Sequence, residues 1–258
     1  MDKIQYQNNQ SNLNHPQEKQ TVLENFNKVA NQISPPSNLI IELGGSILRW
    51  TAVGLTRFLQ DVGYNKRKLA SYRDQSIMLN IGSGEYNKEQ FLTTDILPAG
   101  EGFLKLLIGK HQIKNDLFLD VTYADKHLFD CADSIVLSHV LEHVSPKFAL
   151  QSLRNCWQYL KPNGAIRVTV PYLGVYETSE WPKKKDLKNP MLGKNLMIYC
   201  SGHQFMYDAE LLILLLQEAG FQKVQQVSYQ EGLLGYMDTP GRQNESIYVT
   251  GIKPKTGV

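Results

Sequence analysis

The sequence predicts an α/β fold built on a mostly parallel sheet, and three observations indicate it. From residue 76 onward, short apolar runs alternate with helix-like stretches, which is typical of parallel strands joined by helices. Hydrophobic residues make up 42% and charged residues 20%, as in ordinary globular proteins. The length of 258 residues suits one large α/β domain, or a medium domain with an extension.

The apolar runs after residue 76 define the expected elements. Strands are expected at residues 77–81, 92–95, 117–120, 134–138, 165–170, 223–229 and 247–253. Helices fit residues 146–160 and 208–219. Ligands of such sheets bind at the carboxyl ends of the strands, so the residues that end strands should carry the function.

The chain before residue 76 has a different character. Residues 1–20 are rich in Asn and Gln with few apolar side chains, and we predict a flexible polar tail. Residues 21–75 are predicted to be a helical extension, which could form part of a lid or a homodimer surface. The ligand-binding domain is expected over residues 76–258.

Helical spacing of apolar residues places the elements of this extension. It predicts an amphipathic helix at residues 21–33. One or two further helices are expected between residues 39 and 64, interrupted at Gly44-Gly45. A polar bridge at residues 66–68 would then lead to the first strand.

Charge, hydropathy and cysteine content argue against several kinds of protein. The net charge of +2 is low for a dedicated nucleic-acid binder, so we do not expect a nucleic-acid partner. No stretch has the roughly 18 uninterrupted apolar residues of a membrane-spanning helix. The 3 cysteines form no CxxC pair, which fits a reducing cytoplasm better than a disulfide framework.

Polar or glycine residues follow each of the first three expected strands. Gly82 and Gly84 after the first strand allow a tight turn and a close approach of the backbone to a ligand. Asp95 could accept hydrogen bonds from ribose hydroxyls, or could simply form a turn. Asp120 could accept from an adenine amino group while the Val121 N–H meets a ring nitrogen, or it could cap the following turn.

A group of histidines follows the fourth strand. His139, Glu142 and His143 have the i, i+3, i+4 spacing that places side chains on one side of a helical turn. His203 comes just before the last expected helix. His139 or His203 could act as a general base, or all four residues could bind a divalent metal. Glu142 and His143 could also just cap and pair at a helix start.

Five motifs resemble those of class I S-adenosylmethionine (SAM)-dependent methyltransferases. They are NIGSG, TTD, FDCADSIVLSHVLEHV, LKPNGAIRVTVP and HQFMYDAELLILLLQEAGF, in the order of that family, and they cover about residues 76–253. The resemblance implies SAM as cofactor, methyltransferase activity, and a Rossmann-like seven-stranded sheet whose last strand runs antiparallel.

The resemblance also implies the residues that contact the cofactor. Asn80, Gly82 and Gly84 would line the methionine part, with Ser83 between the glycines. Asp95 and the adjoining Ile96 would hold the ribose, and Asp120 and Val121 the adenine. Ser138 and His139 would border the sulfonium and the acceptor. The family more often has an acid where Asn80 stands, and the short link between the first two strands leaves room for only one helical turn.

A second resemblance concerns the four possible metal ligands. The spacing of His139, Glu142, His143 and His203 is similar to that of the metal-binding motif of small-RNA 2′-O-methyltransferases and some quinone O-methyltransferases. In those enzymes a Glu usually stands at the position of His139. In the methyltransferase fold, a segment such as residues 172–206 covers the acceptor, and its aromatic and Met residues suit an apolar small molecule.

We therefore predict a cytoplasmic SAM-dependent methyltransferase that acts on a small metabolite or natural product, at a hydroxyl or carboxylate oxygen. A metal-assisted O-methyltransferase is a variant of this hypothesis. A non-catalytic SAM-binding partner protein is an alternative, and so is a nicotinamide-dependent oxidoreductase. The oxidoreductase would want a third glycine where Asn87 stands. Near the C-terminus, Asp238, Arg242 and Glu245 could pair with each other or reach the acceptor, and we expect a structural ion pair among them.

Overall fold

The computed structural model describes most of the chain from residue 43 onward. The described residues are 17, 20, 23–24, 43–72, 75–84, 90–97, 115–177, 194–195, 197–198 and 202–255. The helix expected at residues 21–33 lies outside them except for residues 23 and 24, which are helical. The short turn expected between the first two strands, at residues 85–89, also lies outside them.

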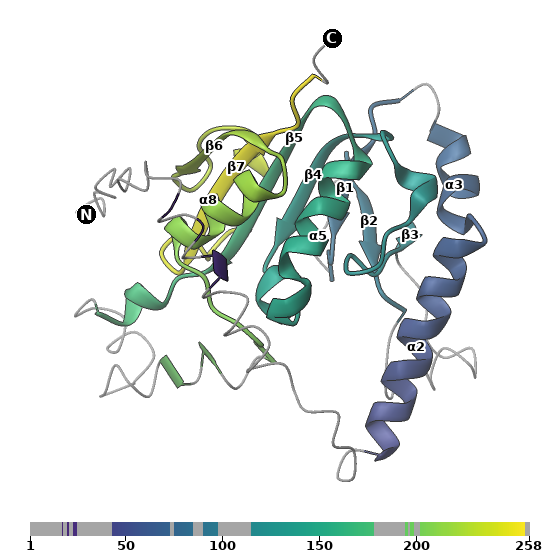
Figure 1. Ribbon diagram of the computed structural model, residues 1–258, viewed down its shortest axis with the longest axis horizontal. Coiled ribbons are helices and arrows are strands. Elements are labelled where there is room, and N and C mark those ends of the chain that lie inside the picture. The colour runs from purple at the N-terminus through teal and green to yellow at the C-terminus, as the bar shows by residue number, and fades with distance from the viewer. Residues whose placement is uncertain are drawn as a thin grey trace.

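The strands of the described residues form one 7-stranded sheet with the order β3-β2-β1-β4-β5-β7-β6 (Figure 1). The strands are β1 Met78–Ile81, β2 Leu92–Asp95, β3 Leu117–Phe118, β4 Ala132–Ser138, β5 Leu160–Pro171, β6 Gln222–Val227 and β7 Ser246–Ile252. Neighbours from β3 to β5 are parallel, whereas β7 is antiparallel to both β5 and β6. The predicted seven-stranded sheet with a reversed last strand is confirmed.

Helices cover one face of this sheet and stand at its β3 edge (Figure 1). Helices α5, Pro146–Tyr159, and α8, Ala209–Glu218, lie on the same face, where they pack against each other and against β5, β6 and β7. Helices α2, Leu43–Asp61, and α3, Tyr64–Leu69, contact β3 at the edge. In the described part of the chain, no helix is both long enough and apolar enough to cross a membrane.

Helix α2 corrects the prediction for residues 39 to 64. It runs through Gly44-Gly45, where we expected an interruption, because these glycines fall in its first turn, whose N–H groups have no intrahelical partner. The chain turns instead at Gly63, whose φ of 70° is left-handed. The Lys-rich residues 66–68, expected as a polar bridge, lie in α3.

The core lies between the central strands and the two helices on the covered face. On α5, Ala149, Leu153 and Cys156 follow one another at helical spacing and are fully buried. They join the buried side chains of β1, β4, β5 and α8 in one cluster. Each fully buried leucine contributes about 1.5–3 kcal/mol to folding. This core fixes the strand ends on which the candidate site is built.

Candidate functional site

The turn after β1 requires glycine and lies against the end of β4. The N–H groups of Gly82 and Ser83 donate to the Thr94 carbonyl at 2.8 and 3.1 Å, which ties the turn to β2. Gly82 has a φ of +64°, and a Cβ added there would lie 2.6 Å from Val140 Cγ2. The hydroxyl of Ser83 is buried and has no partner among the described residues. This hydroxyl group can therefore form a hydrogen bond with a ligand or a water molecule.

Asp95 ends β2 beside this turn. Its Oδ1 accepts from its neighbour Ile96 N–H at 2.8 Å, and its Oδ2 accepts from Gly84 N–H at 3.4 Å. Burial raises the pKa of the Asp95 carboxyl group, and the two backbone hydrogen bonds offset only part of that effect. The structure therefore brings together the glycine turn and the carboxylate that the sequence predicted as the ribose acceptor.

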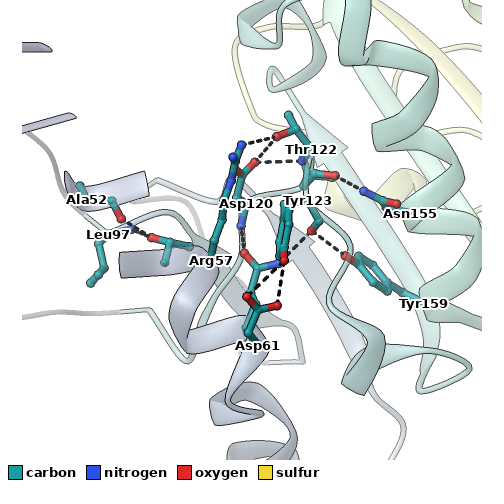
Figure 2. Close-up of polar contacts among 12 residues, drawn as sticks. Ala52, Arg57, Asp61, Leu97, Asp120, Thr122, Tyr123, Asn155 and Tyr159 are labelled. Carbon is teal, nitrogen blue, oxygen red and sulfur yellow. Dashed lines mark hydrogen bonds and ion pairs between the residues drawn. The ribbon is translucent and has the colours of Figure 1, made fainter. Parts of the chain in front are cut away.

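Asp120 follows β3, as predicted, but its carboxylate already has protein partners (Figure 2). Thr122 donates to Oδ1 through both its N–H and its hydroxyl group, at 2.9 and 2.7 Å. Arg57 of α2 donates from Nε to Oδ2 at 2.8 Å. The turn-capping role is thus present, and the adenine role of Asp120 and Val121 stays a prediction. Arg57 was missed by the sequence analysis, because nothing local signals a partner 63 residues away.

Two side-chain amides of α2 and α3 pair with the outer edge of β3 and its following turn. Asn65 donates to the Phe118 carbonyl at 2.7 Å and accepts from the Phe118 N–H at 3.1 Å. Gln60 accepts from the Asp120 N–H and donates to the Tyr123 carbonyl, each at 2.9 Å. These amides satisfy the backbone groups that an edge strand leaves unpaired.

The end of β4 carries a short chain of hydrogen bonds. His139, whose φ of 56° is unusual for a residue other than glycine, has its Nδ1 3.1 Å from Glu142 Oε1 and its Nε2 3.0 Å from Ser246 Oγ. With a proton on Nδ1, His139 donates to the carboxylate and accepts from the Ser246 hydroxyl group at Nε2; with the proton on Nε2, His139 donates to Ser246 instead. Arg242 lies beside this pair, with Nη1 3.3 Å from His139 Nδ1.

Among the described residues, the ion pair of Asp238 is with Arg167 and not with Arg242. Asp238 is bound by Arg167 of β5, with both Nε–Oδ1 and Nη2–Oδ2 distances at 2.6 Å. The side chains of this pair are 0% and 1% exposed. A structural ion pair is present at Asp238, but its partner is Arg167, which lies 71 residues away in the sequence.

Three of the four possible metal ligands lie together. One potential ligand atom from each of Glu142, His143 and His203 lies within 4.8 Å of the others. His139 does not belong to this cluster, because its ring binds Glu142 and Ser246 instead. Glu142 is fully buried, and its Oε2 has no partner among the described residues.

The two histidines of this cluster share one feature of metal-ligating imidazoles. Nδ1 of His143 contacts the Gly202 carbonyl at 3.3 Å, and Nδ1 of His203 contacts the Met197 carbonyl. A proton on each Nδ1 leaves Nε2 as an acceptor, which is the tautomer that binds a metal. Burial lowers the pKa of His203 and favours its neutral form. The set of one carboxylate and two imidazoles fits a divalent cation such as Zn²⁺ or Mn²⁺.

Parts of the segment predicted to cover the acceptor are described. Val175 and Tyr176 are buried, and Tyr172 and Met197 pack against them. Met197 also contacts His203 through its carbonyl group. This segment therefore places one small apolar cluster in contact with His203 through Met197.

The glycine turn, the acidic residue after β2 and the polar end of β4 define a class of protein, namely Rossmann-like enzymes that bind a nucleoside cofactor at the carboxyl ends of parallel strands. A family model described as "Methyltransferase domain" matches residues 50–226, which is more than half of the 258 residues. The chain belongs to this methyltransferase family, and it is a SAM-dependent enzyme. This excludes the nicotinamide-dependent alternative. The match begins within α2.

Solved structures of methyltransferases are similar in fold. A SAM-dependent methyltransferase from Archaeoglobus fulgidus is 16% identical with a TM-score of 0.45, covering 77% of this chain and 94% of its own. Human N-acetylserotonin methyltransferase in complex with SAM is 17% identical with a TM-score of 0.44, covering 92% and 67%. A Haemonchus contortus N-methyltransferase is 15% identical with a TM-score of 0.41, covering 75% and 54%. A search of curated proteins found no match.

The residues present fit SAM as the methyl donor. The space at the Cβ position of Gly84 is open, the buried Ser83 hydroxyl lacks a partner among the described residues, and Asp95 offers a carboxylate beside them. The further contacts expected from Asn80, Ile96 and Ser138 stay predictions.

Proposed function

We propose that the enzyme methylates an oxygen of a small-molecule acceptor, and that Glu142, His143 and His203 hold a divalent cation at the acceptor site. The observation that carries this proposal is the buried Oε2 of Glu142, which has no partner among the described residues and belongs to a cluster with the two imidazoles. An unpaired carboxylate oxygen in the interior is costly unless a cation or a proton occupies the site.

A cation here would supply one kind of chemistry: it would lower the pKa of an acceptor hydroxyl, so that the oxygen is a nucleophile near neutral pH. The protein's own residues have separate tasks. Glu142, His143 and His203 bind the ion, and the carbonyl groups of Gly202 and Met197 orient the two imidazoles. His139 and Ser246 hold the Glu142 carboxylate in place.

A small acceptor with an apolar part suits the surroundings of this cluster. Tyr172, Val175, Tyr176 and Met197 form an apolar cluster next to His203. The net charge of +2 gives little attraction for a phosphate backbone. In-line transfer needs the acceptor and the methyl group to be held in line, and an apolar wall that excludes water favours this arrangement.

Base catalysis without a metal is the second candidate, and the lowered pKa of His203 favours it. A neutral imidazole can accept the proton of a hydroxyl acceptor, which typically contributes about 10²–10⁴-fold to the rate. His139 is less suited to this task, because both of its ring nitrogens have protein partners.

The test is methyl transfer from labelled SAM into a small-molecule extract, run beside a matched total-RNA pool. Protein dialysed against EDTA should be inactive and should regain transfer with Zn²⁺ or Mn²⁺. Glu142→Gln should remain inactive, and His127→Gln, which changes an exposed histidine outside the cluster, should behave as wild type. Full activity in excess EDTA would leave base catalysis by His203 as the mechanism. Label that appears only in RNA would exclude a small-molecule acceptor.

A further inference from the structure

Helix α2 reaches the predicted adenine end of the cofactor site through Arg57. The guanidinium group donates from Nε to Asp120 Oδ2 at 2.8 Å and from Nη2 to Thr122 Oγ1 at 3.3 Å (Figure 2). It also lies over the ring of Tyr123, 5.3 Å from the ring centroid. Asp61, one turn further along α2, accepts from the Tyr123 hydroxyl at 3.0 Å. The turn after β3 is thus fastened to the helix on several sides.

The hydrogen bonds to Asp120 leave room for one more donor. An ionised carboxylate offers about four acceptor positions. Thr122 uses two of them at Oδ1, through its N–H and its hydroxyl group, and Arg57 uses one at Oδ2. The remaining position is on Oδ2, the oxygen that Arg57 orients. An adenine amino group can donate to this position, whereas the carbonyl oxygen of hypoxanthine cannot.

We infer that Arg57 is a positioning residue that sets the specificity of the cofactor site for a 6-amino purine. Arg57 acts through Asp120: it holds Oδ2 in a position where this oxygen accepts a hydrogen bond from a donor group on the purine base. Helix α2 is then part of the cofactor site and not a separate extension. The inference rests on SAM as the methyl donor and is independent of the acceptor and of any metal.

Gln60 has a related but different role. It binds the Asp120 N–H and the Tyr123 carbonyl at once, so it holds the backbone of the turn on both sides of Val121. Its side chain is buried. Because it fixes the backbone and not the carboxylate, its loss should weaken every purine ligand alike.

The test compares the binding of two ligands by calorimetry: S-adenosylhomocysteine and its 6-oxo analogue S-inosylhomocysteine. In Arg57→Met, the affinity for S-adenosylhomocysteine should fall by about 10- to 100-fold, as expected for a lost hydrogen bond to a charged group. The affinity for the 6-oxo analogue should change much less, so the preference for the amino ligand falls. Arg57→Lys keeps the charge near Asp120 and should restore part of the preference.

Controls separate this role from a purely structural one. Arg67→Met makes the same chemical change at an exposed position of α3 and should bind both ligands as wild type does. Gln60→Leu should weaken both ligands by the same factor. Equal losses for both ligands in Arg57→Met, or no loss, would overturn the inference. Tight binding of S-adenosylhomocysteine by wild type shows in either case that the donor site is present, so that assignment is tested separately.

Discussion

Asp238 and Glu142 are both buried carboxylates, yet the described residues bind all the oxygens of one and only one oxygen of the other. Asp238 receives two bonds at 2.6 Å from Arg167 and a third from the Gln230 N–H at 2.7 Å. Glu142 contacts His139 through one oxygen, and its other oxygen lacks a partner among the described residues. The described residues satisfy both oxygens of the first carboxylate, whereas they leave one oxygen of the second without a partner.

The largest effect on stability should come from breaking the satisfied pair. Asp238→Asn leaves the guanidinium of Arg167 buried with incomplete compensation, and we expect a loss of about 3–5 kcal/mol in the free energy of unfolding. Urea denaturation measures it. The double variant Arg167→Met/Asp238→Leu should be more stable than either single variant, because it removes both charges. Additive losses in the double variant would contradict this account of the pair.

Changing the unsatisfied carboxylate should have the opposite pattern. Glu142→Gln removes a buried charge and keeps an oxygen for His139 Nδ1, so the free energy of unfolding should stay the same or rise. Methyl transfer and metal affinity should fall by about 100-fold or more, since even the loss of a residue that only orients a metal ligand costs about 10- to 100-fold. Equilibrium dialysis with Zn²⁺ measures the binding, and urea denaturation of the same sample measures stability. A large loss of stability with unchanged metal affinity would make Glu142 a structural group like Asp238.

Residue patterns in the sequence predict some features of this structure, such as strands and helices, and do not predict others, such as pairs of distant side chains. Apolar runs report burial, so every strand and helices α5 and α8 could be predicted. Strand ends also meet in space, so the approach of Gly84 to Asp95 could be predicted. Patterns do not report which distant side chains pair. Arg167 for Asp238 and Arg57 for Asp120 therefore needed the structure.

The N-terminal helices also differ from what the sequence pattern predicts. Gly44-Gly45 was expected to interrupt a helix, since glycine has a low helix propensity. The free-energy cost of a glycine depends on its position in the helix, and these two glycines lie in the first turn of α2, where glycine is tolerated. Residues 21–75 were expected to be an extension, and the side-chain amides that tie α2 and α3 to β3 carry no sequence signature. The homodimer surface on these helices stays a prediction. The exposure of two large apolar side chains of α2, Trp50 at 74% and Phe58 at 58%, is compatible with it.

The smallest expected effect is the pH dependence that Asp95 causes. The hydrogen bonding of Asp95 is intermediate between that of Asp238 and that of Glu142. Its carboxylate has backbone partners, yet burial still raises its pKa above 3.8. Since the pKa is higher in the folded state than in the unfolded state, the folded protein takes up the proton first, and this group makes the free protein more stable as the pH falls through the raised pKa.

Cofactor binding should respond in the opposite direction, because the ribose hydroxyls need the ionised carboxylate as an acceptor. We expect the affinity for S-adenosylhomocysteine to fall several-fold as the pH is lowered toward the raised pKa. Asp95→Asn should bind more weakly at neutral pH and should lose this pH dependence. Calorimetric titrations of wild type and Asp95→Asn at a series of pH values measure the affinity, and thermal melts of the two free proteins give the stability contribution of this carboxyl group as their difference. If the affinity of Asp95→Asn falls on acidification as that of wild type does, a group other than Asp95 controls binding, and the carboxylate would belong with Asp238 among the structural ones.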